Sequence, residues 1–500
     1  MQQTRSPRNF VNVFSRLTNL FGKRTRHGGR VLRPTRRLRA RFDAAVTTDD
    51  NRRHWVGADG LSADAAASPD VRRTLRNRAR YEVANNSYAR GIVLTLANDV
   101  IGTGPRLQLL TESADVNRRV EQEFSRWSES VGLPEKLRTM RAACAEDGES
   151  FVIFTNNPKL DTRIKLDLKL VEADQVTTPD LHVSDSSLPP HVDGIVFDSD
   201  GNPLVYHVLK DHPGGLNYGI DTQYNRIPAA AVIHLYRVDR PGQSRGVPEL
   251  TPAIPLFAQL RRYTLAVISA AETAADFAGV LYTDAPPNGE TDSIEPMDVI
   301  ELEKRMLLTM PGGWKMGQIK AEQPATTYAE FKHEILNEIA RCLNMPFNVA
   351  AGNSSGYNYA SGRLDHQTYF KSIRVDQSRF NTIVLDRLFN AWMREAVLID
   401  ELLPMSLRMI GSTWPHQWFW DGHEHVDPAK EANAQATRLA NHTTTLADEY
   451  ARRGQDWETQ LRQRAKERAL MDELGLSNEA DQLTDESEED EDAETAQQSA

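Results

Sequence analysis

A short polar segment between two strongly helical segments constrains this chain more than any other feature. It covers Met345–Arg363, reads MPFNVAAGNSSGYNYASGR and is rich in glycine, serine and asparagine. Glycine permits backbone conformations that other residues avoid, and Asn and Ser side chains compete with the backbone for hydrogen bonds. We therefore expect a loop that interrupts two helices. It is either a surface connection or a mobile element that contacts something polar and varied.

The segments on both sides of this loop carry apolar residues at helical spacing. In the preceding segment, 328–343, four apolar residues lie four positions apart: Phe331, Ile335, Ile339 and Leu343. The following segment, 364–397, carries a longer stripe of Tyr369, Ile373, Phe380, Val384, Leu388 and Trp392. The spacing predicts two helices, each with one apolar face.

Length and composition allow a large folded protein. The chain has 500 residues, of which 40% are hydrophobic, and this predicts two to four domains. Its two cysteines, Cys144 and Cys342, provide neither a disulfide framework nor a zinc site, which is typical of a reducing compartment. No apolar run approaches the roughly 18 residues that span a bilayer, and the N-terminus has no apolar signal core. We therefore expect a soluble intracellular protein.

Charge is concentrated at the two ends of the chain. Residues 1–50 contain twelve Lys and Arg against three acids, and residues 477–500 contain ten acids and no base. Both ends are typical of disordered or partly ordered arms. The basic arm either binds nucleic acid or docks on an acidic protein surface. The acidic tail is better interpreted as a solubilising extension than as a specific site.

Turn signals and periodicity predict an α+β first half with an antiparallel sheet in its middle. The predicted helices cover 68–102, 115–129 and 133–146. The predicted strands cover 106–110, 150–156, 162–174, 194–198, 205–209 and 231–237. In the second half we expect helices at 251–278, 297–308, 428–439 and 457–474, another helix after Thr445, and strands at 280–282 and 312–319; the segment 413–421 is rich in aromatic residues.

The predicted helix 251–278 has an unusual composition in its second half. Alanines cluster there: Ala266, Ala270, Ala271, Ala274, Ala275 and Ala278. Small residues let neighbouring helices approach closely, which suits an element that packs against copies of itself. The alternative is that these alanines only reflect high intrinsic helix propensity.

The sequence contains no convincing catalytic, cofactor or metal site. His416, His423 and His425 surround Glu424, but no further His or Cys completes a coordination shell at typical spacing. The phosphate-binding Gly-x-x-x-x-Gly-Lys-Ser/Thr loop and the Gly-x-Ser-x-Gly nucleophile motif are absent. The carboxylates Glu146, Asp147 and Glu149 lie at a predicted helix-to-strand turn, where acids are common. We expect no enzyme, no metal and no cofactor, but a component of an assembly.

Five blocks of sequence, in order, resemble the lambda-type portal proteins of tailed bacteriophages. They are 76–104 (with NNSYARGI and ANDVIGTG), 145–151 (AEDGESF), 232–250 (with VIHLY and PGQSRGVP), 335–363 (ending NYASGR) and 418–434 (with VDPAKEANA). Each block alone is weak evidence for the family, but five in the right order are strong evidence. Together they span roughly residues 70–460. One departure is Gly362, where the family pattern has Ala before the Arg; it should loosen the start of the following helix.

The resemblance implies an α+β portal fold with nine consecutive parts. These are a basic arm (1–50), a wing of antiparallel sheet and helices (51–249), a first stem helix (250–278), a small α/β clip (279–327), a second stem helix (328–343), a tunnel loop (344–363), a long helix that returns to the wing (364–426), a helical crown (427–476) and an acidic tail (477–500). The implied stem-packing residues are Ala266, Ala270, Ala271, Ala274 and Ala275. The implied DNA-facing residues are Asn353, Ser354, Ser355, Tyr357, Asn358, Tyr359 and Ser361. Tyr357 and Tyr359 could instead pin the loop to a neighbouring subunit.

The function implied by the resemblance is a channel for double-stranded DNA during packaging and ejection. The family forms a homo-oligomeric ring of twelve at one capsid vertex of the virion, assembled in the cytoplasm of the bacterial host. Its implied partners are the terminase large subunit, the major capsid and scaffolding proteins, and the neck or head-completion proteins, with no membrane. The segment 344–362 has no charged residue and the chain has a net charge of −11, consistent with a conduit that does not grip DNA.

The sequence argues against two other functions. A DNA-processing enzyme or motor subunit would need nucleotide-binding or metal-binding motifs, and these are missing. A different head–tail connector, such as a ring-forming tail or neck adaptor, is typically far smaller and has no counterpart of the tunnel-loop block.

Overall fold

The computed structural model describes most of the chain. The described residues are 46, 48–178, 190–215, 223–276, 280–283, 314–317, 327–356, 358–399, 402–403, 405–408, 414–422 and 428–476. The predicted helix 297–308 therefore lies outside them. The chain divides into two compact units, Met1–Gly60 and Leu61–Ala500. The described part of the first unit contains a short 3-10 helix, η3 (His54–Gly57), and all elements below belong to the second unit.

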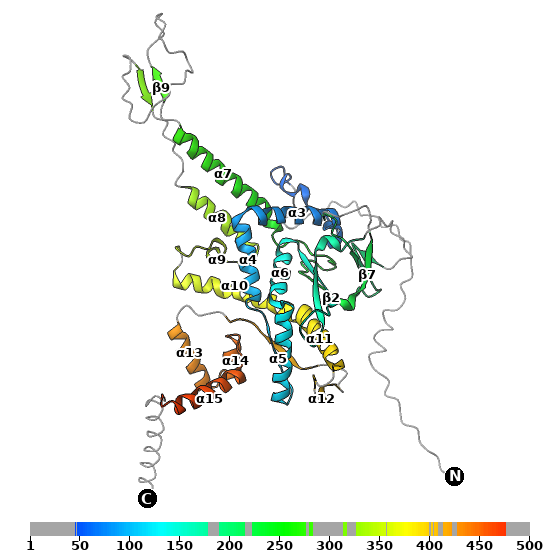
Figure 1. Cartoon of the computed structure of the whole chain (residues 1–500). Coiled ribbons are helices and arrows are strands. Elements are labelled where there is room, and N and C mark those ends of the chain that lie inside the picture. Colours follow the sequence, from blue (N-terminus) through cyan, green and yellow to red (C-terminus); the bar gives the residue numbers. More distant parts are fainter. Residues whose placement is uncertain are drawn as a thin grey trace, which may run out of the picture. The chain divides into compact units, whose positions relative to one another are not determined.

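The second unit mixes helices with antiparallel strands, as Figure 1 shows in chain order. Its first half contains α2 (Ala63–Ala66), α3 (Pro69–Asn85), α4 (Ser87–Ile101), β1 (Arg106–Leu109), α5 (Ala114–Ser130), α6 (Leu133–Glu146), β2 (Glu149–Asn156), β3 (Leu166–Val171), η4 (Ala173–Gln175), β4 (His191–Val192), β5 (Ile195–Phe197), β6 (Pro203–Leu209), β7 (Tyr224–Pro228), η5 (Ala229–Ala231) and β8 (Val232–Tyr236). Its second half contains η6 (Thr251–Ala253), α7 (Ile254–Asp276), β9 (Val280–Thr283), β10 (Trp314–Gly317), α8 (Thr327–Arg341), α9 (Phe347–Ala351), α10 (Tyr359–Phe380), η7 (Asn381–Leu385), α11 (Asp386–Leu398), α12 (Met405–Arg408), β11 (His416–Phe419), α13 (Pro428–Ala440), α14 (Leu446–Ala451) and α15 (Trp457–Glu473). This order confirms the α+β class.

Local signals explain the limits of the first two long helices. α3 begins with Pro69, whose missing N–H would have no helical partner at that position anyway. The sequence predicted one helical segment through 68–102, but Asn86 divides it. The Asn86 side chain accepts hydrogen bonds from the backbone N–H groups of Tyr88 and Ala89, and this N-cap starts α4 as a separate helix.

The single antiparallel sheet predicted for the middle of the chain is two sheets. One has the strand order β3-β2-β8 and the other β4-β5-β6-β7, with every pairing antiparallel. The sequence did not predict β4, which has two residues, or β7, which reads YNRIP and lacks alternation of apolar and polar residues. Two ribbons, β1 with β11 and β9 with β10, pair segments that are distant in the sequence.

The long helix predicted after the polar segment is confirmed, and it supplies much of the main core. α10 continues through the π-helical turn η7 into α11. Its six predicted apolar positions are at most 1% exposed: Tyr369, Ile373, Phe380, Val384, Leu388 and Trp392. At the π turn, the indole N–H groups of Trp420 and Trp418 donate to Asn381 and Asp386 at 3.0 and 2.9 Å. These two bonds join the long helix to the region of β11.

The polar segment is less irregular than predicted, because a helix forms inside it. α9 occupies five of its residues, and α10 begins at Tyr359 instead of at 364. Met345 and Ala350 are buried, and Phe347 and Val349 pack against the main core, so tertiary contacts outweigh the weak local helix signal.

A glycine marks the start of the remaining loop, Gly352–Asn358, and another lies in the helix that follows it. Gly352 ends α9 with a φ of 61°, a conformation that side chains disfavour. Gly362, which was expected to loosen the helix start, lies inside α10, where its N–H donates to the backbone oxygen of Asn358.

Removing a core side chain of the long helix should destabilise the fold strongly. Trp392 is fully buried, so Trp392→Ala should lower the free energy of unfolding by about 3–5 kcal/mol. The matched control is Leu398→Ala on the same helix, where the side chain is 83% exposed and the change should stay within about 0.5 kcal/mol. Urea denaturation followed by circular dichroism measures both; equal effects would place Trp392 outside the core.

Candidate functional site: a charge cluster, two helices and a loop

Helix α3 buries a stripe of arginines where a helix normally buries apolar residues. Arg72 and Arg76 are only 1% and 4% exposed, and Arg80 follows at the same spacing of four. A buried charge is tolerated only when it is paired. Arg72 pairs with Asp193 in the turn between β4 and β5. The stripe therefore packs on the sheets through ion pairs.

Carboxylates from the turns around the sheets meet the other two arginines. Arg76 binds Asp174 at 3.0 Å and lies 3.6 Å from Glu149. Arg80 binds Asp147 at 2.6 Å and Asp174 at 2.9 Å. Burial acts to lower the pKa of Arg80, but the hydrogen bond and charge of Asp147 outweigh it and raise this pKa above its ordinary value.

The centre of this charge cluster is the pair of Glu149 and Arg245, whose side chains are fully buried. Arg245 donates to the Glu149 carboxylate through Nη2 at 2.6 Å and through Nε at 2.9 Å. The same carboxylate contacts His234 Nε2 at 3.0 Å and accepts from the Gly246 backbone N–H at 3.0 Å. Such a bidentate pair with further hydrogen bonds is the arrangement in which a buried ion pair is tolerated.

The cluster fixes the protonation states of the Glu149 carboxylate and the His234 imidazole. Burial acts to raise the pKa of Glu149, but the charge of Arg245 and the hydrogen bonds from His234 and Arg245 hold it well below its ordinary value. Burial lowers the pKa of His234 against the opposing effect of Glu149. At neutral pH the carboxylate is therefore charged, and a neutral imidazole donates its Nε2–H to it.

Two of the sequence blocks meet here, and their glycines allow it. A Cβ on Gly148 would overlap the backbone of Val247, and a Cβ on Gly246 would overlap the backbone oxygen of Gly148. The interpretation of Glu149 as a turn residue was wrong. It begins strand β2 and holds Arg245, and the signal was present as an acid and an arginine in two separate blocks.

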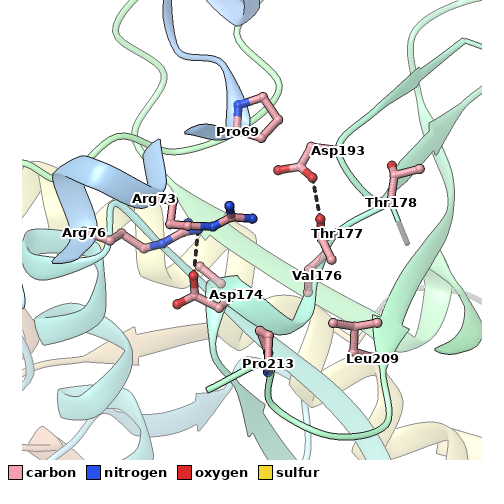
Figure 2. Close-up of a pocket in the computed structure, with 11 residues that line it drawn as sticks. Pro69, Arg73, Arg76, Asp174, Val176, Thr177, Thr178, Asp193, Leu209 and Pro213 are labelled. Carbon is pink, nitrogen blue, oxygen red and sulfur yellow. Dashed lines mark hydrogen bonds and ion pairs between the residues drawn. The ribbon is translucent and has the colours of Figure 1, made fainter. Parts of the chain in front are cut away.

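A pocket of about 250 Å³ lies beside this cluster, between α3 and the turns of the two sheets. Figure 2 shows the residues that line it. Arg73, Arg76 and Asp174 lie next to one another in its wall, and Asp193 lies farther along the wall (Figure 2). Thr177 donates to Asp193 at 2.8 Å, so the polar groups of the wall largely bind one another.

One group among the described residues could in principle hold a metal ion: Glu172, Asp174 and His212. However, Arg80 lies 3.1 Å from Glu172 and 2.9 Å from Asp174. The guanidinium already supplies the positive charge that a metal would bring, so we assign no metal to this group. Of the histidines considered from the sequence, His416 binds the Trp414 backbone oxygen and Asp386, and His423 and His425 lie outside the described residues.

The cysteines do not form a reactive site. Burial raises the pKa of the Cys144 thiol to about 12 and that of the Cys342 thiol to about 11. Neither is a thiolate at neutral pH, and the thiolate is the nucleophilic form.

The two helices expected to form the stem, α7 and α8, pack against each other through aromatic residues. Tyr263 lies 4.7 Å from Phe331 and 5.6 Å from Tyr328, measured between ring centroids. The hydroxyl groups of Thr264 and Tyr328 are 3.1 Å apart. Lys332 lies 5.0 Å from the ring centroid of Tyr88 and so joins this pair to α4.

The alanines of α7 do not make this contact as a group. Ala266 and Ala270 are exposed, Ala271 is half-buried, and the side chains of Ala274 and Ala275 lie outside the described residues. Two large neighbours, Leu265 and Ile268, are also 58% and 49% exposed. Within the described residues, nothing covers this apolar face of α7.

The loop Gly352–Asn358 exposes several of the predicted DNA-facing residues. Asn353, Ser354, Ser355 and Asn358 are exposed, and Tyr357 lies outside the described residues. Tyr359 and Ser361 belong to α10, whereas the prediction placed them in the loop; their side chains are not described.

Hydrogen bonds hold the base of this loop. Asn353 Oδ1 accepts from the Ser355 N–H at 3.0 Å, so this acceptor stabilises the loop itself. Asn348 Nδ2 lies 2.9 Å from His366 Nε2 and so ties α9 to α10. This contact between Asn348 and His366 could not be predicted from the sequence, because nothing in a spacing of eighteen residues indicates a contact.

Breaking the central ion pair should cost more than removing a surface pair. Arg245→Leu leaves Glu149 buried without its partner and should lower the free energy of unfolding by about 3–5 kcal/mol. Adding Glu149→Leu should cost less than the sum of the single changes, because the two side chains interact directly. The control Asp239→Ala breaks the exposed pair with Arg237 and should change stability by about 1 kcal/mol or less. Urea denaturation measures the two single variants, the double variant and the control against the unchanged protein. If the losses of stability in the two single variants add up fully in the double variant, the pairing is contradicted.

Acid should weaken the cluster in two steps. Folded His234 has a pKa below 6.5, so below that pH only the unfolded chain takes up this proton and stability falls. Folded Glu149 has a pKa below 4.5, so its contribution is complete above pH 4.5 and is lost as the pH falls further. His234→Gln should flatten the first step and keep the second. The measurement is the melting temperature of the His234→Gln variant and of the unchanged protein as a function of pH. If the two curves superimpose, this role of His234 is contradicted.

Comparison with known proteins agrees with the family that the sequence resembles. The family model described as phage portal protein, lambda family, matches residues 48–377. A probable portal protein of Halomonas phage phiHAP-1 is 26% identical over 452 residues, which are 85% of each chain. Portal protein B of Escherichia phage lambda is 22% identical over 467 residues, covering 81% of this chain and 85% of that protein.

Solved structures show weaker similarity. A chain of the virion of a native gene transfer agent particle has a TM-score of 0.41 at 12% identity, covering 79% of this chain and 94% of that chain. A chain from the neck of such a particle, computed with C12 symmetry, has a TM-score of 0.39 at 14% identity, covering 75% and 90%.

The family match extends over most of the chain. Of the described helices, none has both the length and the apolar character needed to cross a membrane. Portal proteins are structural components of phage particles and not enzymes. This chain belongs to the lambda family of phage portal proteins and serves as a phage-like portal, the connector between head and tail.

Proposed function

We propose that this portal assembles as a ring of twelve copies at one capsid vertex and encloses the channel for double-stranded DNA. The observation that carries the proposal is the uncovered apolar face of α7. Leu265 and Ile268 lie on this helix with more than a third of their surface exposed, next to exposed Ala266 and Ala270. A chain that leaves such a face exposed gains stability by covering it in an assembly.

Within this proposal α7 and α8 are the stem, and the loop Gly352–Asn358 faces the DNA. A conduit must admit a polyanion without holding it, as a channel admits its ion. Neutral hydrogen bonds contribute roughly 0.5–1.5 kcal/mol net, whereas charge-assisted bonds are about twice as strong and salt-dependent. The exposed side chains of Asn353, Ser354 and Ser355 carry no charge, so they form no salt-dependent ion pair with a phosphate. Because Asn353 Oδ1 stabilises the loop, the serines are the better candidates for contact with phosphates.

The remaining parts follow the boundaries expected for the family. Residues 51–249 form the wing, 279–327 the clip, 364–426 the return to the wing and 427–476 the crown. The clip would dock the terminase large subunit and later the neck proteins, and the crown and wing would meet capsid and scaffolding proteins in the virion. The basic arm (1–50) and acidic tail (477–500) would extend from this ring, which would assemble in the host cytoplasm.

Positive charge in the loop should impair DNA passage and spare assembly. The triple variant Asn353→Lys, Ser354→Lys, Ser355→Lys adds three charges per chain, which would bind phosphates of every sequence. Rings and empty capsids should form normally, while packaging or retention of full-length DNA falls. The matched control replaces the same three residues with Gln, which also removes the Asn353 turn but adds no charge. Nuclease-protected DNA per particle is the measurement.

Two outcomes would count against the DNA-facing loop. If the lysine variant packages and ejects DNA like the unchanged protein, the loop does not face the DNA. If the glutamine control fails as badly as the lysine variant, the loop acts through its structure and not through its lack of charge.

A further inference from the structure

The two proposed stem helices expose faces that carry different charges. On α7 the exposed face carries Arg262 beside the apolar residues Leu265 and Ile268, and the carboxylate Glu272 one turn beyond Ile268. Arg262 has no ion-pair partner among the described residues. The other arginine of this turn, Arg261, is engaged, because its guanidinium lies 5.7 Å from the ring centroid of Tyr81. Arg262 is thus available to a group outside the chain.

On α8 the exposed face carries carboxylates at a spacing of one helical turn. Glu330, Glu334 and Glu338 follow one another every four residues, so they lie on one stripe. Within the part of the chain that the structure describes, Glu334 contacts only its neighbour His333, at 3.2 Å, and Glu330 and Glu338 have no cationic partner. Three like charges on one stripe repel one another and favour a cation from elsewhere.

A groove of about 520 Å³ runs beside this stripe. Its lining residues are Phe331, Glu334, Ile335, Asn337, Glu338 and Arg341. Phe331 is 46% exposed although it is a large aromatic residue, so the floor of the groove is apolar. The rim carries the carboxylates Glu334 and Glu338 and, at its far end, the exposed cation Arg341. The exposed face of α7 has a complementary composition, with apolar side chains between the cation Arg262 and the carboxylate Glu272.

We propose that α7 of one copy seats in the α8 groove of the next copy around the ring. Leu265 and Ile268 cover the apolar floor at Phe331, and Arg262 meets Glu334 and Glu338 at the rim. The α7 of the same chain contacts Phe331 and Tyr328 through Tyr263, but it leaves Phe331 46% exposed and its own Leu265 and Ile268 turned away from α8, so it does not fill the groove. The occupant is therefore a second copy, and this inference rests on the proposed ring.

The contact joins two different surfaces, so it is heterologous. A heterologous contact repeats from copy to copy and closes into a ring when the rotation between copies allows it. The apolar part supplies most of the affinity, whereas the charges select the partner and the register. Reversing the charges should therefore decide which copies can be neighbours.

Two charge-reversal variants of the full chain test the contact. Variant one is Arg262→Glu, and variant two combines Glu334→Lys with Glu338→Lys. In each variant alone, every contact between copies sets like charges against each other, and ring yield should fall about tenfold or more. In a mixture, the acidic α7 of variant one meets the basic groove of variant two, and the unchanged Arg262 of variant two meets the acidic groove of variant one. The mixture should restore rings in which the two variants alternate.

Native mass spectrometry of the mixture, with one variant carrying a mass tag, reads the result. The expected rings contain both variants in equal number. The control Arg464→Glu reverses an exposed charge on α15 and should leave ring yield unchanged. Circular dichroism establishes that each variant is folded.

The outcomes separate this inference from the proposed function. If the unchanged protein forms rings and each variant alone also does so at full yield, the α7–α8 contact is wrong and the ring remains. If folded variants fail alone and also fail when mixed, the two faces are not partners and the contact is again overturned. If the unchanged protein forms no ring at any concentration, the proposed function itself fails.

Discussion

The buried pair of Glu149 and Arg245 holds together the parts on which the rest of the structure depends. Besides Glu149, Arg245 donates to the backbone oxygens of Val176 and Asp193. One guanidinium thus connects the three-stranded sheet, through β2, with the turns at the four-stranded sheet. The segment that carries Arg245 leads directly into η6 and α7. The start of the proposed stem is therefore attached to the sheets by charge, because a misplaced partner would leave an uncompensated buried ion.

A second buried pair extends this attachment to the long helix. Arg141 of α6 lies 2.8 Å from Glu249, just before η6, and 2.9 Å from Asp376 of α10. Burial acts to lower the pKa of Arg141, but the charges of Glu249 and Asp376 raise it above its ordinary value. The segment that precedes α7 is thus anchored on both the sheets and α10. Such a base suits a stem that must keep its direction while neighbouring copies pack on it.

Much of the fold could be predicted from the sequence, because periodicity reports burial. The stripe from Tyr369 to Trp392 predicted a long core helix, and every one of its positions is buried. The charge cluster could not be predicted, since Glu149 and Arg245 are 96 residues apart and ion pairing leaves no period. Helix α9 was missed because packing stabilises it more than local propensity does. For the site, Asn353 and Ser354 are exposed, and their position facing DNA stays a prediction. Their part in the loop's own hydrogen bonds could not be predicted, because it depends on three-dimensional contacts.

The central claim is that the apolar face of α7 is covered by other copies in a closed ring. Native mass spectrometry of the purified full-length protein tests it most directly, because closed rings give one discrete mass, whereas open chains give a ladder. The account predicts a single dominant species at an integer multiple of 56.2 kDa, twelvefold for the proposed ring. A species at 56.2 kDa alone across protein and salt concentrations, or an unbroken ladder of masses, would contradict it.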